Sequence, residues 1–170
     1  MRIILTIAIL TLAGLTAAAQ QPQQLRVGSD APAFAAEALD GRLLSLPEME
    51  GKVVVMTFWS TKCAICHSEI PKLNLVAKRY EGQDVVFLAL TMENSSRIQP
   101  YLQKNPFNFT IVPNSFGVVL KFADMDSGGR MNIGFPAHFL IGRDGKIAHR
   151  TNGFDKASNI DAQISRLLNE

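Results

Sequence analysis

The residues with the clearest chemical potential are Cys63 and Cys66, the only cysteines in the 170-residue chain. Two cysteines are too few to form the disulfide scaffold of a small secreted domain. Because only two residues separate them, one helical turn can bring both sulfur atoms within bonding range. The pair predicts a redox-active dithiol. The same spacing also occurs in zinc sites and, when His follows as His67 does here, in c-type haem attachment sites.

A dithiol reacts through its thiolate form, so the surroundings of each cysteine decide its role. Cys63 is expected at the N-terminus of a helix, where unpaired backbone N–H groups and the helix dipole lower a thiol pKa. Lys62 places a positive charge beside it. We therefore expect Cys63 to be the exposed nucleophile and Cys66, one turn further, to be the buried thiol that resolves a mixed disulfide.

The elements that position the dithiol are a strand and a helix. Residues 53–59 are almost continuously apolar and predict a central strand buried on both faces. A helix is predicted from Cys63 to about Tyr80, because apolar residues recur at the spacing of one helical face. These residues are Cys66, Ile70, Leu73, Ala77 and Tyr80. The site would lie where a strand ends and a helix begins, which is where open α/β sheets place their sites.

The rest of the chain alternates strand and helix patterns, which predicts an α/β fold with a central mixed sheet flanked by helices. Asp40-Gly41 and Asp144-Gly145 predict two hairpins, between strands at 33–38 and 42–45 and at 137–141 and 146–150. A further strand is predicted at 85–90, and a loop with a short strand at 107–112. Helices are predicted from Ser95 or Ser96 to Lys104, Ser115 to Phe122, and Asp155 or Ser158 to Leu168. The polar segment 124–132 predicts a flexible loop insertion near a partner groove.

Besides a purely structural place for both cysteines in the core, three other uses of the pair compete with disulfide exchange. A zinc site needs a second Cys/His pair with ligand spacing, and the sequence has none. A haem attachment motif is not expected directly after a buried strand that ends in Phe58-Trp59. A peroxiredoxin-type thiol peroxidase needs Pro-x-x-x-Thr/Ser-x-x-Cys; Ser60 fits this pattern, but Met56 stands in place of the proline. We therefore expect no cofactor and no metal.

Length and charge predict one domain that does not bind nucleic acid. The chain has 17 Lys and Arg residues against 15 Asp and Glu residues, a formal net charge of +2, with no basic block. A chain of this length can bury a core without disulfide staples.

The N-terminus predicts export from the cytoplasm. Met1-Arg2, the apolar run that follows and Ala17-Ala18-Ala19 predict a signal peptide over residues 1–19, with an uncleaved membrane anchor as the alternative. Residues 20–27 predict a linker and residues 28–170 the folded domain. We expect a periplasmic or other extracytoplasmic location, where a reducing dithiol needs an external electron supply.

The stretch from Thr57 to Cys66 resembles the thioredoxin-like active site, Phe-Trp-x-x-x-Cys-x-x-Cys, and Pro71 matches the proline of the active-site helix. Residues 134–141 and 144–147 resemble the cis-proline loop and closing hairpin of that family. With the N-terminal hairpin, the resemblance is to extracytoplasmic thiol-disulfide oxidoreductases of the TlpA/ResA type and covers about residues 27–168. It implies a thioredoxin-like fold with an N-terminal β-hairpin extension.

The resemblance also implies a substrate-binding surface. Pro136 should be a cis-proline beside the dithiol, and Trp59, Phe135 and Pro136 should bind the substrate. For Trp59, a plain core position beside the dithiol is the alternative. His138, two residues after Pro136, is expected to be a plain strand residue. His67 is expected to face solvent.

The third catalytic residue implied by the resemblance is Glu69. Thr57 stands where thioredoxins carry a buried Asp, and Glu69 matches an acidic residue of the ResA-like branch. Glu69 lies about 60° around the helix from Cys66. A partly buried carboxylate there should have a raised pKa and could accept the proton of Cys66.

The function implied is a thiol-disulfide oxidoreductase that reduces disulfides in exported proteins, with apocytochromes c among the candidates. Its partners would be exported protein thiols and disulfides and a membrane thiol-disulfide electron donor, and we expect a monomer. The spacer Ala64-Ile65 holds no His, Pro, Gly or charge, which favours a reductase over a strong oxidant.

Overall fold

The computed structural model describes residues 25–151, 153 and 157–170. The predicted signal peptide or anchor and residues 20–24 of the predicted linker lie outside this part of the chain. Leu25 is buried in the core, and its carbonyl accepts a hydrogen bond from Arg150. The packed domain therefore begins before residue 28, earlier than predicted. Within the described residues, no helix has the length and apolar character needed to cross a membrane.

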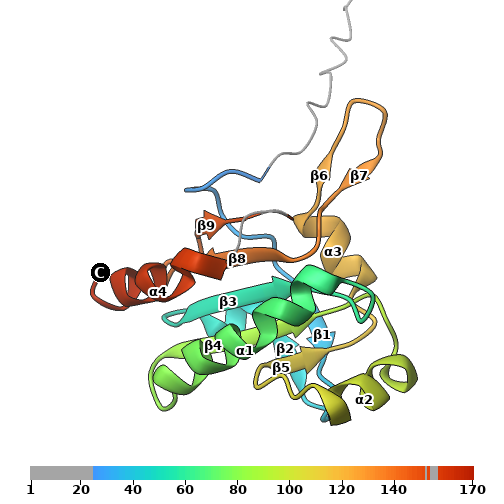
Figure 1. Cartoon of the computed structure of the whole chain (residues 1–170). Helices are drawn as coiled ribbons and strands as arrows, with labels where there is room; N and C mark the ends of the chain where they lie inside the picture. Colours follow the sequence, from blue (N-terminus) through green and yellow to red (C-terminus); the bar gives the residue numbers. More distant parts are fainter. Residues whose placement is uncertain (1–24, 152, 154–156) are drawn as a thin grey trace, which may run out of the picture.

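A five-stranded mixed sheet, in the order β5-β4-β3-β8-β9, forms the centre of the fold (Figure 1). Its middle strand, β3 (Val53–Phe58), pairs in parallel with β4 (Val85–Leu90) and antiparallel with β8 (Ala137–Ile141). The edge strands are β5 (Thr110–Val112) and β9 (Ile147–Arg150). Every residue of β3 is buried, which confirms the predicted central strand.

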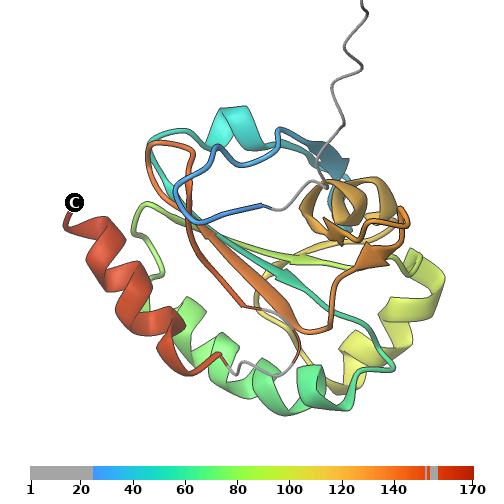
Figure 2. The ribbon, with the colours of Figure 1, turned by 90° about the horizontal axis from the view of Figure 1, so that it is seen from above.

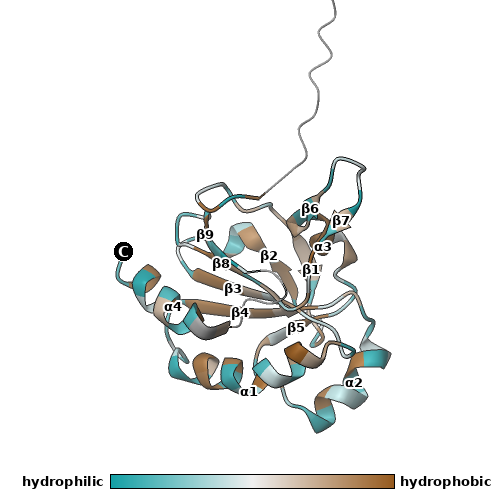
Figure 3. Ribbon diagram, turned by 45° about the horizontal axis from the view of Figure 1, so that its top comes forward, coloured by the Kyte–Doolittle hydropathy of each residue, from teal (hydrophilic) through white to brown (hydrophobic). Residues whose placement is uncertain are grey.

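Helices cover both faces of this sheet (Figure 2). On one face lie α1 (Ala64–Arg79), α2 (Ser95–Lys104) and α4 (Ile160–Leu168). On the other lie α3 (Phe116–Phe122) and the N-terminal extension. Figure 3 shows apolar strands between helices whose outer faces are largely polar, as a core enclosed from both sides requires.

The side chains of β3 alternate between two apolar clusters, because successive residues of a strand point to opposite faces. Val54, Met56 and Phe58 pack on the side of α3. Val53 and Val55 pack with Trp59 on the side of α1 and α4. Thr57 has the same parity as Val55, and so its side chain points toward α1.

The predicted N-terminal hairpin is present. It consists of β1 (Ala35–Glu37) and β2 (Leu43–Ser45), which pair antiparallel, and a short 3-10 helix, η1 (Leu46–Met49), follows. Gly41 has a φ of +83° in the connecting turn, a backbone conformation that glycine adopts without strain.

The segment predicted to be a loop insertion is instead a small hairpin of β6 (Asp124–Met125) and β7 (Met131–Asn132), which projects from the body of the fold (Figure 1). Asp126 orders its turn by accepting hydrogen bonds from the backbone N–H groups of Gly128 and Arg130. The loop prediction was wrong because glycine and aspartate also suit the tight turn of a hairpin.

Two predicted helix caps differ in the structure. Asn94, and neither Ser95 nor Ser96, caps α2 by accepting a hydrogen bond from the backbone N–H of Arg97. The last helix is preceded by a 3-10 turn, η2 (Ala157–Asn159), which puts Asn159 at the N-cap position. Asp155 lies outside the described residues.

Candidate active site

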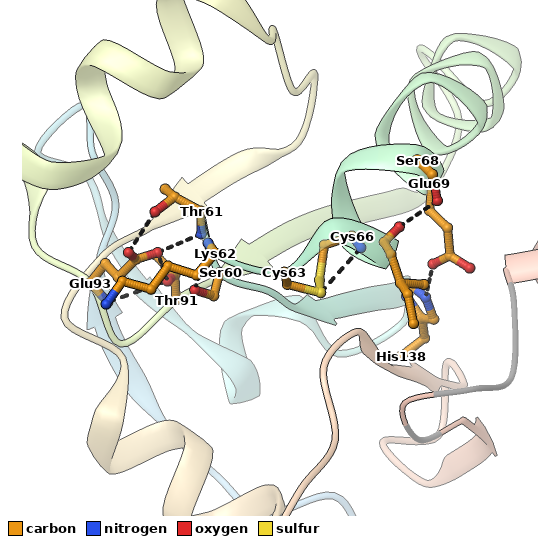
Figure 4. The surroundings of a disulfide bond; sticks show 11 residues. Ser60, Thr61, Lys62, Cys63, Cys66, Ser68, Glu69, Thr91, Glu93 and His138 are labelled. Carbon is orange, nitrogen blue, oxygen red and sulfur yellow. Dashed lines mark hydrogen bonds and ion pairs between the residues drawn. A yellow bond between two sulfur atoms is a disulfide. The ribbon is translucent and has the colours of Figure 1, made fainter.

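The dithiol lies where β3 leads into α1, and the structure contains it as a Cys63–Cys66 disulfide (Figure 4). Cys63 is the N-cap residue of α1, and its sulfur accepts a hydrogen bond of 3.1 Å from the backbone N–H of Cys66. Cys63 is half-buried, whereas Cys66 is 2% exposed. The structure thus confirms an accessible first cysteine and a buried second one.

The turn before the dithiol is held by Glu93, which the sequence did not single out. The Glu93 carboxylate accepts hydrogen bonds from the backbone N–H of Thr61 at 2.6 Å and from its hydroxyl at 2.7 Å. Burial raises the pKa of Glu93, but the hydrogen bonds from Thr61 and Ser60 and the charge of Arg97 lower it, and the net pKa lies below the ordinary value. Glu93 is therefore ionised when it fixes this turn.

Replacing Glu93 with Gln should destabilise the protein by about 1.5–3 kcal/mol at pH 7, the usual range for hydrogen bonds to a charged group. Because folding lowers the pKa of Glu93, its stabilisation is present above the unfolded-state pKa, about 4.3, and is lost as the pH falls through the folded value. Urea unfolding of the two proteins from pH 7 to pH 3 should show the difference shrinking below about pH 4.5. A difference that is constant over this range would contradict the assignment.

The predicted cis-proline is confirmed, since the Phe135–Pro136 peptide bond is cis. Pro136 immediately precedes β8, whose Ala137 pairs with Phe58 at the end of β3 from which the chain continues to the dithiol. The proline loop and the dithiol therefore lie at the same end of the sheet. Phe135 is half-buried and packs against both apolar clusters.

Trp59 does not line the surface, so the expectation that it binds substrate is corrected. Its side chain is fully buried and packs against Tyr101 and Phe107, with ring centroids at 5.6 and 5.7 Å. It belongs to the same apolar cluster as Cys66. Trp59 thus supports the dithiol from within the core.

On the other side of the dithiol from Glu93, Glu69 and His138 form a buried pair (Figure 4). Glu69 Oε2 lies 3.1 Å from His138 Nε2, and Glu69 Oε1 accepts a hydrogen bond of 3.1 Å from the backbone N–H of Ala157. His138 Nδ1 lies 3.0 Å from Thr57 Oγ1 on the neighbouring strand. His138 is fully buried and hydrogen-bonded at both ring nitrogens, and it is not the plain strand residue that we expected.

The raised pKa expected for Glu69 is also wrong. Burial raises it, but the hydrogen bond from His138, the backbone N–H of Ala157 and the charges of His138 and Lys72 lower it more, and the net pKa lies below the ordinary value. The expectation considered burial alone, because the partners of Glu69 are far away in the sequence. Glu69 is therefore an ionised, hydrogen-bonded carboxylate.

His67, beside Cys66 in the sequence, has a different environment from the one predicted. It is half-buried and stacks on Tyr101, with ring centroids 4.8 Å apart. Within the described part of the chain, no three His, Cys, Asp or Glu residues are grouped so that they could hold a metal ion.

Comparisons with known proteins agree with this geometry. The profile of the AhpC/TSA family matches residues 27–150. The chain is 29% identical to the thiol-disulfide oxidoreductase ResA of Geobacillus thermodenitrificans, over 86% of this chain and 83% of that protein. It is 28% identical to ResA of Bacillus subtilis, over 77% and 70%. A crystal structure of a candidate DsbE thiol:disulfide interchange protein from Chlorobium tepidum superposes with a TM-score of 0.71 and 26% identity, over 85% of this chain and 99% of that one.

The fold is thioredoxin-like, with a Cys-x-x-Cys pair at the N-terminus of its first long helix and a cis-proline loop at the same end of the sheet. The chain belongs to the AhpC/TSA family. Together with the likeness to ResA, the dithiol makes it a thiol-disulfide oxidoreductase.

Proposed function

We propose that this protein reduces disulfide bonds in exported proteins, outside the cytoplasm, through Cys63 and Cys66. The observation that carries the proposal is the unequal exposure of the two cysteines at the start of α1. The accessible Cys63 can meet a partner, whereas the buried Cys66 can reach only Cys63. That asymmetry is what a two-step exchange requires.

In the first step, the thiolate of Cys63 attacks one sulfur of the partner disulfide, a mixed disulfide forms, and the other partner sulfur leaves as a thiolate. In the second step, Cys66 loses its proton and attacks the sulfur of Cys63. The Cys63–Cys66 disulfide forms, and the second partner sulfur leaves. Two electrons have then passed to the partner, and a membrane thiol-disulfide donor must return them.

The partner segment would lie along Phe135 and Pro136, which precede β8 at the end of the sheet that carries the dithiol. An extended segment there could form strand-like hydrogen bonds with the loop backbone. Phe135 is only half-buried and would offer apolar contact. In this proposal the catalytic residues are Cys63, Cys66 and Glu69.

The support for the reducing direction is the spacer between the two cysteines. The exposed spacer residues Ala64 and Ile65 bring no charge or hydrogen-bond donor to its thiolate. Since the spacer adds no further stabilisation of the thiolate, it favours the dithiol as an electron donor.

Equilibration of the purified protein with glutathione buffers should give a midpoint potential below about −200 mV, on the reducing side of protein disulfide isomerase at about −180 mV. The oxidised fraction is read by alkylation and mass spectrometry. A midpoint near the value of about −120 mV found for the strong oxidant DsbA would contradict the reductase role.

A second candidate, thiol peroxidase activity, is raised by Ser60, which fits the Thr/Ser position of the peroxidatic motif. The peroxidatic motif needs a proline at position 56, and this position holds Met56, in the middle of β3 and paired with strands on both sides. Purified protein with a reductant should therefore consume hydrogen peroxide no faster than Cys63→Ser does. Cysteine-dependent consumption would favour the peroxidase.

Export, a monomeric state and apocytochrome c as a substrate belong to the same proposal. The support for export is the predicted signal over residues 1–19. The support for protein disulfides as substrates is the likeness to ResA and DsbE. Loss of c-type cytochromes in a strain that lacks this protein, restored by the wild type and not by Cys63→Ser, would support the apocytochrome role.

A further inference from the structure

Thr57, His138 and Glu69 form a continuous hydrogen-bonded chain beneath the dithiol. It joins three elements, since Thr57 is on β3, His138 on β8 and Glu69 on α1. His138 is fully buried and the Glu69 side chain is 6% exposed. Glu69 and Cys66 are three residues apart on α1 and both are buried, so their side chains are neighbours on one helical face.

The chain of hydrogen bonds defines where the protons lie. Ionised Glu69 can only accept, so the hydrogen between it and His138 must be on Nε2. In neutral His138, Nδ1 is then an acceptor, and the Thr57 hydroxyl donates to it. If His138 gains a proton on Nδ1, the Thr57 hydroxyl can rotate and accept instead. The site can therefore hold one more proton without leaving a buried group unpaired.

The other groups packed around Glu69 and His138 cannot take up this additional proton. Besides His138, the charged side chain that lowers the pKa of Glu69 is Lys72 on the same helix. From the segment after β9, Thr151 accepts a hydrogen bond from the backbone N–H of His138, and from η2 the backbone N–H of Ala157 contacts Glu69. These two contacts fix the geometry and carry no charge.

We propose that His138 is a positioning residue for the second step of exchange: it orients Glu69, and the Glu69–His138 pair takes up, as one unit, the proton that Cys66 loses. This proposal rests on the proposed function and deepens it. An ionised carboxylate alone is a weak acceptor for a thiol proton, because its ordinary pKa is about four units lower. The imidazole of His138, 3.1 Å from the carboxylate, gives the pair a second atom that can hold the proton.

The step balances without any additional reagent. The S–H bond of Cys66 breaks, and its proton passes to the Glu69–His138 pair. The electron pair left on the Cys66 sulfur forms the bond to Cys63, and the bond between Cys63 and the partner breaks. The partner leaves as a thiolate, and the pair afterwards returns its proton to the thiolate or to solvent.

The two steps can be timed separately with the full chain, reduced and mixed in a stopped-flow instrument with 5,5′-dithiobis(2-nitrobenzoic acid). Attack by Cys63 releases the first equivalent of thionitrobenzoate, and resolution by Cys66 releases the second. In His138→Gln, the second phase should slow at pH 7 by at least about tenfold, a modest loss for proton-transfer catalysis. Its pH profile should move to higher pH, because Cys66 then loses its proton only to solvent, and the first phase should keep the wild-type rate.

A mutant cycle separates this role from a structural one. Glu69→Gln should move the second phase in the same direction, and the double variant should add nothing further, since the pair acts as one unit. His149→Gln, on β9, is the matched control and should leave both phases at the wild-type rate. A second phase in His138→Gln that superposes on wild type at every pH would overturn the proposal. Absence of the first phase in the wild type would instead contradict the exchange function.

If the variants do not fold, the unmodified sequence still provides a test. The ring ¹⁵N shifts of His138, followed from pH 5 to pH 9, should titrate differently in the oxidised and the reduced protein, because only the reduced form has a thiol to exchange a proton with the pair. Identical titrations in both forms would overturn the proposal.

Discussion

Replacing Cys63 with Ser should lower the rate of disulfide reduction by at least about 10³-fold, because a hydroxyl cannot take the place of the attacking thiolate. Cys66→Ser should also stop turnover, but it should leave the first step intact, since Cys63 remains at the N-terminus of α1. The measurement is reduction of insulin disulfides at a fixed concentration of dithiothreitol.

The control for both variants is Ser68→Ala. Ser68 is exposed on the same helix, one turn from Cys63 and Ala64. This variant should retain a rate close to that of the wild type. If Cys63→Ser kept more than about a tenth of the wild-type rate, Cys63 would not be the nucleophile.

The largest expected effect on stability is at Phe122. Its ring on α3 contacts those of Phe34, Phe58 and Phe139, with centroids at 6.2, 5.7 and 5.1 Å, and is fully buried. Phe122→Ala would leave a cavity between the sheet and α3 and remove three aromatic contacts. We expect the free energy of unfolding to fall by about 3–5 kcal/mol.

Phe116 provides the matched control for this substitution. It lies on the same helix but is 53% exposed. Phe116→Ala should change the free energy of unfolding by less than about 0.5 kcal/mol. Urea unfolding of the oxidised proteins measures both values, and equal losses in the two variants would contradict the assignment of Phe122 to the core.

The elements that carry the dithiol could be predicted because their signals are local. The apolar run of β3 and the helical spacing from Cys66 to Tyr80 each lie within one short segment. The cis-proline was predicted from a resemblance, on residues adjacent to Pro136. Such patterns place the two cysteines correctly, one accessible and one buried.

The parts that the sequence did not predict depend on contacts between distant segments. Glu93 fixes the turn at Thr61 from 32 residues away, and His138 meets Glu69 across 69 residues. In the sequence, Thr57 was noted only because it replaces the buried Asp of thioredoxins. In the structure, its hydroxyl is hydrogen-bonded to His138. Only the pairing of β3 with β8, which places Thr57 opposite His138, brings these groups together.

The direction of the pKa shift of Glu69 also depends on contacts between distant segments. Burial could be inferred from the helical face, and burial alone raises the pKa of a carboxylate. The hydrogen bonds from His138 and Ala157 reverse the net direction, and both come from the C-terminal third of the chain. Predicting the pKa of a buried ionisable group therefore requires its hydrogen-bond partners as well as its degree of burial.

The most direct test of the exchange mechanism is to identify the covalent adduct that Cys66→Ser forms. The reduced variant is incubated with a disulfide-containing peptide and analysed by intact-mass and fragment mass spectrometry. We predict one peptide bound per protein through a mixed disulfide at Cys63, stable until a reductant is added. A variant that forms no adduct at Cys63, although folded and reduced, would contradict the mechanism.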